Sequence, residues 1–325
     1  MTALSNNVLG MQSSLRPGGP AAEVTTEMTW VLAIGAGVVF GVVLLCIAAA
    51  LRHRHRAPAV DSGRAERWWI VGAGVVFPLL VLVPLLLYAT ARTDALTPPR
   101  LATGADELVI TVQARLWWWR VTYRDPLIGH EVITANQINL PTGRAVRLAL
   151  VSDDVIHSFW VPALAGKVDM VPGKVHHLWL QADRAGVYRG QCAEFCGEQH
   201  ARMAIHVVAQ SPDDFSRWLQ AQAAPAAAPS GPDAVRGLAI FTERRCSACH
   251  SVLGLGAGPV ATLGPDLTHL ASRLHLGAGT LPFNRASLAD WIADPQHAKP
   301  GVRMPSYALD AASMQALVSF LEQLR

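Results

Sequence analysis

Two long apolar runs stand out near the N-terminus. No residue is charged from Met28 to Leu51 or from Trp68 to Ala91. A helix needs roughly 20 apolar residues to cross a bilayer, so each run predicts a membrane-spanning helix, and together they predict a hairpin over residues 28–92. The tail of residues 1–27 carries acids, instead of a basic region, just before the first run, which favours a retained helix over a cleaved secretory signal.

The segment between the runs predicts the orientation of the hairpin. Its basic residues are Arg52, His53, Arg54, His55, Arg56, Arg64 and Arg67. Short arginine-rich loops stay in the cytoplasm, so both chain ends are expected on the outer, periplasmic face. Pro78 and Pro84 are expected to interrupt the second helix, which favours packing against another membrane protein. Glu66, at the cytoplasmic start of that helix, is either a solvated charge or a carboxylate that admits protons to a partner subunit.

Beyond residue 106 the pattern changes to short strands separated by Gly, Pro, Asp and Asn. Strands are predicted at 108–112, 145–151, 176–180 and 203–208. Short strands at regular intervals predict a β sandwich or barrel, here over residues 106–220. Residues 221–232 are rich in Ala and Pro and predict a semi-rigid linker. A last domain, residues 233–325, ends in an amphipathic stretch over 311–324.

Charge and cysteine content narrow the chemistry. The 325 residues hold 27 Lys and Arg against 24 Asp and Glu, so the balance gives no indication of nucleic-acid binding. Five cysteines are too few for a disulfide scaffold. Cys46 lies inside the first apolar run, whereas the other four form the close pairs Cys192/Cys196 and Cys246/Cys249. Histidines follow both pairs, which indicates cofactors.

The first pair belongs to a set of soft metal ligands. The set comprises Cys192, Cys196, His200 and Met203, with His157 earlier in the chain. Thiolates, imidazoles and a thioether favour copper, whereas zinc or a disulfide has no use for the methionine. Two cysteines allow both thiolates to bridge two copper ions, and a backbone carbonyl, for which Glu194 is the candidate, would complete the ligands. The histidines expected on the surface or on a strand face are His130, His176, His177 and His206.

This region resembles the CuA centre of cytochrome c oxidase subunit II. The resemblance rests on the motif from Gly186 to Met203, on residues 157–162 and on the two preceding helices. It implies a cupredoxin-like β-barrel with a dinuclear copper centre. The implied ligands are His157, Cys192, Glu194 through its carbonyl, Cys196, His200 and Met203. The carboxylate of Glu194 is further implied to reach a magnesium ion shared with subunit I, or else only to orient the loop.

Two further positions take a role from the resemblance. Residues 116–119 resemble the aromatic strand above the copper, with Trp117 as the residue where electrons enter. The match is partial, because Trp118 replaces a tyrosine and Arg115 and Leu116 replace His-Gln, so core packing is the alternative. Glu66, followed by Trp69, resembles the opening of the K proton pathway in this family.

The second cysteine pair predicts a c-type heme. Cys246, Cys249 and His250 form the C-x-x-C-H attachment motif, for which a zinc or redox pair is the alternative. Met304 is the expected sixth ligand, and a methionine ligand raises the reduction potential. Its rivals are Met314, His269, His275 and His297. The segment resembles a class I cytochrome c, which implies an all-α domain.

Together the resemblances imply a multidomain membrane protein, the subunit II of a caa-type heme–copper oxidase in a bacterial plasma membrane. Electrons would pass from heme c to the copper and on to the heme of subunit I, where oxygen is reduced to water and protons are pumped. Expected partners are subunits I and III, the lipid bilayer, and cytochrome c or a quinol–cytochrome c reductase as donor. A CuA-containing nitric oxide reductase remains the alternative. A quinol oxidase subunit would lack the copper ligands present here.

Overall fold

The computed structural model describes residues 12–53, 62–94, 108–124, 128–255 and 263–325. Most of the arginine-rich loop, the first eleven residues of the tail and the predicted domain start at residue 106 lie outside the described residues. The chain divides into two compact units. One combines Met1–Ala22 with Ala102–Arg325, and the other is Glu23–Leu101.

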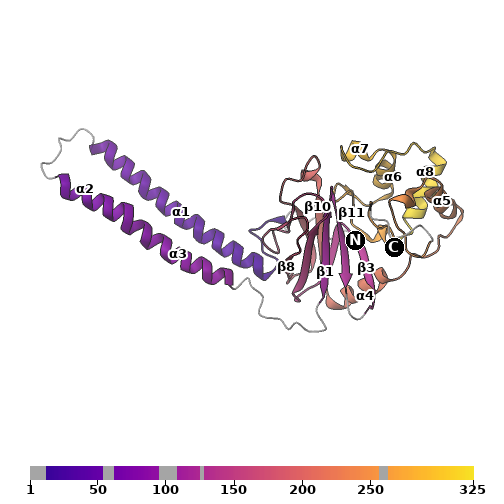
Figure 1. The fold of residues 1–325 in the computed structure, drawn as a ribbon, viewed down its shortest axis with the longest axis horizontal. Coiled ribbons are helices and arrows are strands. Elements are labelled where there is room, and N and C mark those ends of the chain that lie inside the picture. The colour runs from indigo at the N-terminus through magenta and orange to yellow at the C-terminus, as the bar shows by residue number, and fades with distance from the viewer. Residues whose placement is uncertain (1–11, 54–61, 95–107, 125–127, 256–262) are drawn as a thin grey trace. The chain divides into compact units, whose positions relative to one another are not determined.

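Two long helical segments run side by side in the smaller unit (Figure 1). The first is α1 (Pro20–His53), and the second comprises α2 (Ser62–Val71), a π-helical turn (Gly72–Val76) and α3 (Phe77–Asp94). Both are long and apolar enough to cross a membrane, over Pro20–Arg52 and Glu66–Thr93. The Tyr88 hydroxyl donates to the Glu27 carboxylate at 3.0 Å, which joins α3 to α1.

A π-helical turn interrupts the second helix just before Pro78, whereas the interruption predicted at Pro84 is wrong. Pro84 lies inside α3, and Pro78 is the second residue of α3. Proline has no N–H group and cannot donate the usual helical hydrogen bond. A π turn changes the backbone hydrogen-bond pattern locally, so the helix can continue past the missing bond. The helical path therefore continues to Asp94.

The β domain, residues 108–223, packs two five-stranded sheets face to face. The first sheet has the order β3 (Glu131–Ala135), β2 (Trp118–Arg124), β1 (Val109–Arg115), β5 (Val146–Ser152) and β8 (His176–Leu180). The second has the order β4 (Gln137–Pro141), β10 (Ala204–Gln210), β9 (Gly186–Cys192), β6 (His157–Trp160) and β7 (Val168–Met170). The four strands predicted from sequence are confirmed as β1, β5, β8 and β10.

Alternation of side chains fills the core between the sheets. Successive residues of β1 and β5 are buried in turn, because neighbouring strand residues point to opposite faces. Trp119 and Phe159, one from each sheet, meet edge to face with ring centroids 5.9 Å apart. Helix α4 (Pro212–Ala223) adds Phe215 and Leu219 to this core. This helix extends beyond the predicted linker start at residue 221, because alanine favours helix. It ends at Ala223, since Pro225 disfavours a helical conformation of Ala224.

The helical domain, residues 232–325, forms a second core. Its elements are α5 (Pro232–Glu243), η5 (Cys246–Ala248), η6 (Leu270–Ser272), β11 (His275–Leu276), β12 (Leu281–Pro282), α6 (Arg285–Ala293), α7 (Pro295–Ala298) and α8 (Ala311–Leu321). Phe241 on α5 and Phe320 on α8 meet with ring centroids 5.7 Å apart. The amphipathic stretch predicted at the C-terminus is confirmed as α8.

A close crossing of α5 and α8 depends on Gly237. A Cβ atom there would lie 2.1 Å from the Ala316 carbonyl oxygen and 2.7 Å from the Phe320 Cβ. We therefore expect Gly237→Ala to destabilise the helical domain by about 1–3 kcal/mol, although alanine favours helix. Thermal unfolding followed by circular dichroism would measure this. Gly166→Ala is the control, because its Cβ would meet nothing within 4 Å. Equal stability of Gly237→Ala and the unchanged chain would contradict the close packing.

Candidate metal centre and heme-binding segment

Strand pairing brings the predicted metal ligands of the β domain together. β9 ends at Cys192 and β10 begins directly after Met203, and the Cys192 amide donates to the Met203 carbonyl at 2.9 Å. This bond closes the loop between them, called here the metal loop (residues 192–203). β6 pairs with the other edge of β9, with Phe159 opposite Cys192. His157, the first residue of β6, therefore lies beside the metal loop.

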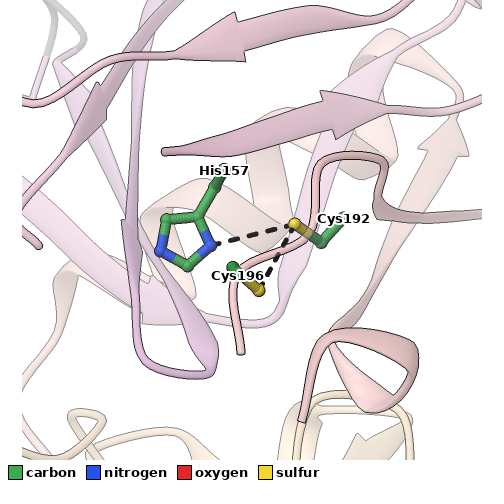
Figure 2. Close-up of side chains that lie close together, drawn as sticks. All are labelled: His157, Cys192 and Cys196. Atoms are coloured by element: carbon green, nitrogen blue, oxygen red, sulfur yellow. Dashed lines mark hydrogen bonds between the residues drawn. The ribbon is translucent and has the colours of Figure 1, made fainter. Parts of the chain in front are cut away.

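Three buried side chains form the centre of this cluster (Figure 2). The His157 Nδ1 lies 3.8 Å from the Cys192 Sγ. The Cys192 and Cys196 sulfurs are 3.7 Å apart, and both thiols are free. All three residues are almost completely buried, so bulk water does not compete for their ligand atoms.

The remaining predicted ligands surround the two sulfurs. The His200 Nδ1 is 3.7 Å and the Met203 Sδ 4.0 Å from the Cys196 Sγ. The Glu194 carbonyl oxygen is 3.2 Å from the Cys192 Sγ. Two ligands of one metal ion, at about 2.3 Å for sulfur and 2.0 Å for nitrogen, lie roughly 3.5 Å apart. The separations and the soft donor set therefore fit copper ions shared between the sulfurs.

The pair of thiols is poised to lose one proton. The contact between the two sulfurs lowers the pKa of Cys192. The same contact, together with burial, raises the pKa of Cys196. A thiolate is the metal-binding form of cysteine, so the contact favours the metal-binding form of Cys192.

Asp154 orients His157 and was not identified from the sequence. The His157 Nε2–H donates to Asp154 Oδ1 at 2.8 Å, and Oδ2 of the same carboxylate accepts from the Leu116 amide at 2.8 Å. Burial alone would lower the pKa of His157, but its bonds to Cys192 and Asp154 raise it. With Nε2 protonated, the lone pair of Nδ1 faces the sulfurs, as metal-bound histidines require. The position of Asp154 three residues before His157 was the available signal.

Trp117 contacts the metal loop directly. Its indole N–H donates to the Cys196 carbonyl at 2.9 Å. Gly197 has φ +109°, and a Cβ atom there would lie 3.2 Å from the indole ring, so glycine suits both the backbone and the contact. Trp118 instead carries the Arg115 guanidinium 6.0 Å from its ring centroid. Glu66 lies exposed on α2, in the smaller unit.

The C-x-x-C-H segment presents its histidine in a ligand-ready tautomer. Cys246 and Cys249 are free thiols at η5. The His250 Nδ1–H donates to the Pro265 carbonyl at 2.7 Å, which leaves the lone pair on Nε2. Burial lowers the pKa of His250 and favours its neutral form. A Cβ at Gly264 would lie 2.7 Å from this ring. These features fit attachment of a c-type heme with an imidazole ligand.

The candidates for the second axial ligand differ in their surroundings. Met304 and Met314 both pack against the apolar core that also contacts Cys246. Of the other rivals, the His269 Nε2 bonds the Ala224 carbonyl at 2.9 Å, and His275 stacks on His206. His297 is exposed.

The helical domain also contacts the β domain, which the sequence did not indicate. The Leu274 amide donates to Gln137 Oε1 at 3.0 Å, and the Ala204 amide donates to the Ala278 carbonyl at 3.0 Å. The rings of His206 on β10 and His275 on β11 stack with centroids 4.0 Å apart and planes 6° apart. His206 is therefore a strand-face histidine, as expected, but its ring packs against the other domain.

Comparisons with known proteins cover both domains. Residues 129–210 match the family of cytochrome c oxidase subunit II, periplasmic domain, and residues 234–325 match cytochrome c. Cytochrome c oxidase subunit 2 of Alkalihalophilus pseudofirmus is 32% identical over 339 residues, 100% of this chain and 95% of that protein. Its counterpart in Bacillus sp. (strain PS3) is 31% identical, over 81% of this chain and 75% of that protein. The solved periplasmic domain of subunit II of cytochrome oxidase from Bradyrhizobium japonicum is 27% identical with a TM-score of 0.34, covering 37% of this chain and 96% of that domain.

The stacked histidines predict that acid weakens the contact between the two domains. Burial, then His275 and Arg189, lower the pKa of His206 from 6.5 to about 3. Burial and Arg189 also lower the pKa of His275. The docked state thus binds fewer protons than the separated one, so docking is strongest above about pH 6.5 and weakens towards pH 3.

Hydrogen exchange of the Ala204 and Leu274 amides between pH 7 and pH 5, corrected for intrinsic rates, would measure this loss. His206→Phe keeps the ring stack and should reduce the pH dependence, whereas His177→Phe, at an exposed position, should not. The same pH dependence in all three proteins would exclude the histidine pair as its cause.

Proposed function

Because this chain belongs to the cytochrome c oxidase subunit II family and carries a fused cytochrome c domain, we propose that it passes electrons from its helical domain to its β domain and on to subunit I. The observation that carries this proposal is the convergence of five metal-ligand groups of the metal loop with a sixth, His157 of β6, in a chain that also holds a C-x-x-C-H segment. The input and output stations of an electron path therefore belong to one polypeptide.

Membership in this family supports several properties of the chain. The chain is a subunit of a heme–copper oxidase, which implies a membrane protein that associates with subunit I and takes part in electron input to the oxidase. The β domain implies copper and the last domain implies heme. The predicted fold class is confirmed, with two apolar helices, a cupredoxin-like domain and a cytochrome c domain.

We assign the dinuclear copper to the metal loop. The residues that would hold it are His157, Cys192, Glu194 through its carbonyl, Cys196, His200 and Met203. Cys246 and Cys249 would bind heme c covalently, and His250 and Met304 would bind its iron. When bound, the copper and the heme supply one-electron redox chemistry. Asp154 holds the His157 tautomer, and the buried walls of the loop exclude water from the donor atoms.

The remaining roles follow the family resemblance. Trp117, bonded to the Cys196 carbonyl, is the proposed residue where electrons enter the metal centre. The Glu194 carboxylate is half exposed and pairs with the Lys167 ammonium at 3.8 Å, and we propose that it reaches a magnesium ion shared with subunit I. The arginine-rich loop supports an orientation with both large domains on the periplasmic side. Glu66 would then admit protons to subunit I from the cytoplasm, and cytochrome c or a quinol–cytochrome c reductase would supply electrons, with subunit III as a further partner.

Metal and heme content of the purified complex, with its optical spectrum, tests the cofactor assignment. Oxygen uptake coupled to proton release tests the oxidase assignment. Nitric oxide consumption without oxygen uptake would instead identify the alternative, a nitric oxide reductase with the same copper centre.

Replacing one bridging thiol should destroy the paired-copper arrangement. We expect Cys196→Ser to abolish the near-infrared mixed-valence signal, because a hydroxyl is a poor bridging ligand for copper. Absorption and electron paramagnetic resonance spectra would measure it. Cys46→Ser, on the exposed surface of α1, is the matched control and should keep the signal. Survival of dinuclear copper in Cys196→Ser would refute the bridging assignment.

Redox titration of two variants distinguishes Met304 from Met314 as the heme ligand. Met304→Ala should leave the heme attached through Cys246 and Cys249 but lower its potential by on the order of 100 mV, within the roughly 0.8 V that axial ligands span. Met314→Ala should leave the potential nearly unchanged, because we place its side chain only in the core. The reverse pattern would transfer the ligand assignment to Met314.

A further inference from the structure

Lys299 is a buried lysine at the boundary between the helical and β domains. It directly follows α7 and precedes Met304 in the same loop, and its side chain is 2% exposed. An ammonium group loses its hydration on burial, so it is stable there only where specific acceptors replace the water. A buried lysine outside the metal centre therefore requires an explanation from its contacts.

The acceptors of Lys299 belong to two different domains. Its Nζ donates to the Trp117 carbonyl at 2.8 Å and to the Gly277 carbonyl at 3.2 Å. Trp117 is part of the β domain, whereas Gly277 follows β11 of the helical domain. Trp117 also donates its indole N–H to the Cys196 carbonyl at 2.9 Å. A single residue thus separates the Lys299 ammonium from a ligand of the metal centre.

The loop that carries Lys299 is held in a fixed shape by Gln296. The Gln296 side-chain amide donates to the Val302 carbonyl at 2.6 Å and to the Met304 carbonyl at 3.2 Å. Its oxygen accepts from the Gly301 amide at 2.9 Å. Because these bonds tie the two ends of the loop together, the position of Lys299 also determines the position of the Met304 backbone.

We propose that Lys299 is a positioning residue that docks the Met304 loop of the helical domain onto Trp117, and through Trp117 onto the metal loop. This inference rests on the proposed function, because docking matters only if electrons cross between the domains. The β domain of the same chain is then the partner surface of the helical domain. Salt screens buried contacts only weakly. The rate of electron transfer from the helical domain to the β domain should therefore depend only weakly on ionic strength.

A Lys299→Met variant of the intact oxidase complex tests docking separately from folding. The Ala204 and Leu274 amides bond across the domain boundary, so their hydrogen exchange reports docking. Amides of α8 report folding of the helical domain. We expect exchange at the two boundary amides to accelerate by about tenfold or more, with α8 unchanged. The control is Lys174→Met, which removes an exposed lysine and should change neither.

Electron transfer provides the second readout. After flash reduction of the heme, transfer to the β domain should slow at least about tenfold in Lys299→Met, while the copper spectrum stays the same. Unchanged boundary exchange would overturn the proposal. So would parallel acceleration in α8, which would make Lys299 a folding residue of the helical domain. An unmodified complex without copper or heme signals would refute the proposed function instead, and the exchange comparison would still decide the docking.

Discussion

The pairing of β9 with β6 on one edge and β10 on the other is the constraint on which the metal centre depends. β9 ends in Cys192, β6 begins with His157, and Met203 directly precedes β10. A shift of one residue in either pairing would turn one of these side chains to the opposite face of the sheet. The packed core between the sheets holds the register and therefore fixes the backbone positions of these residues.

The same constraint extends beyond the metal loop to the helical domain. Cys196 accepts a hydrogen bond from Trp117, and Trp117 accepts one from Lys299. Each of these bonds joins a side-chain donor to a backbone carbonyl, so substitution of Trp117 or Lys299 removes the donor and leaves the acceptor in place. Ala204, directly after the last ligand of the loop, donates to Ala278 of the helical domain. Metal binding and domain docking therefore share the strand end at Met203.

The sequence predicted which residues converge at the metal loop, but it did not predict the residues that surround them. A local sequence motif is enough to predict four of these residues, because they lie within one short loop: Cys192, Cys196, His200 and Met203. Lys299 and Gln137 act across a domain boundary, and no periodicity or motif marks a residue whose partner lies far away in the chain. Pro84 of the second helix misled for a different reason, since the neighbouring backbone can adjust to a missing N–H group.

A tether alone would keep the two domains at a high local concentration, and the structure adds specific contacts to the tether. The linker itself is part of the contact surface, because the Ala224 carbonyl bonds His269 and the Ala226 amide bonds the Leu253 carbonyl. Ordering of this kind removes the search for a productive orientation that a freely tethered donor would repeat for each electron. With the Lys299 loop seated on Trp117, an external donor would meet the helical domain first. Under the proposed function, the fused domain would then be the receiving surface of the oxidase, and the partner of the metal loop on this face would be part of the same chain.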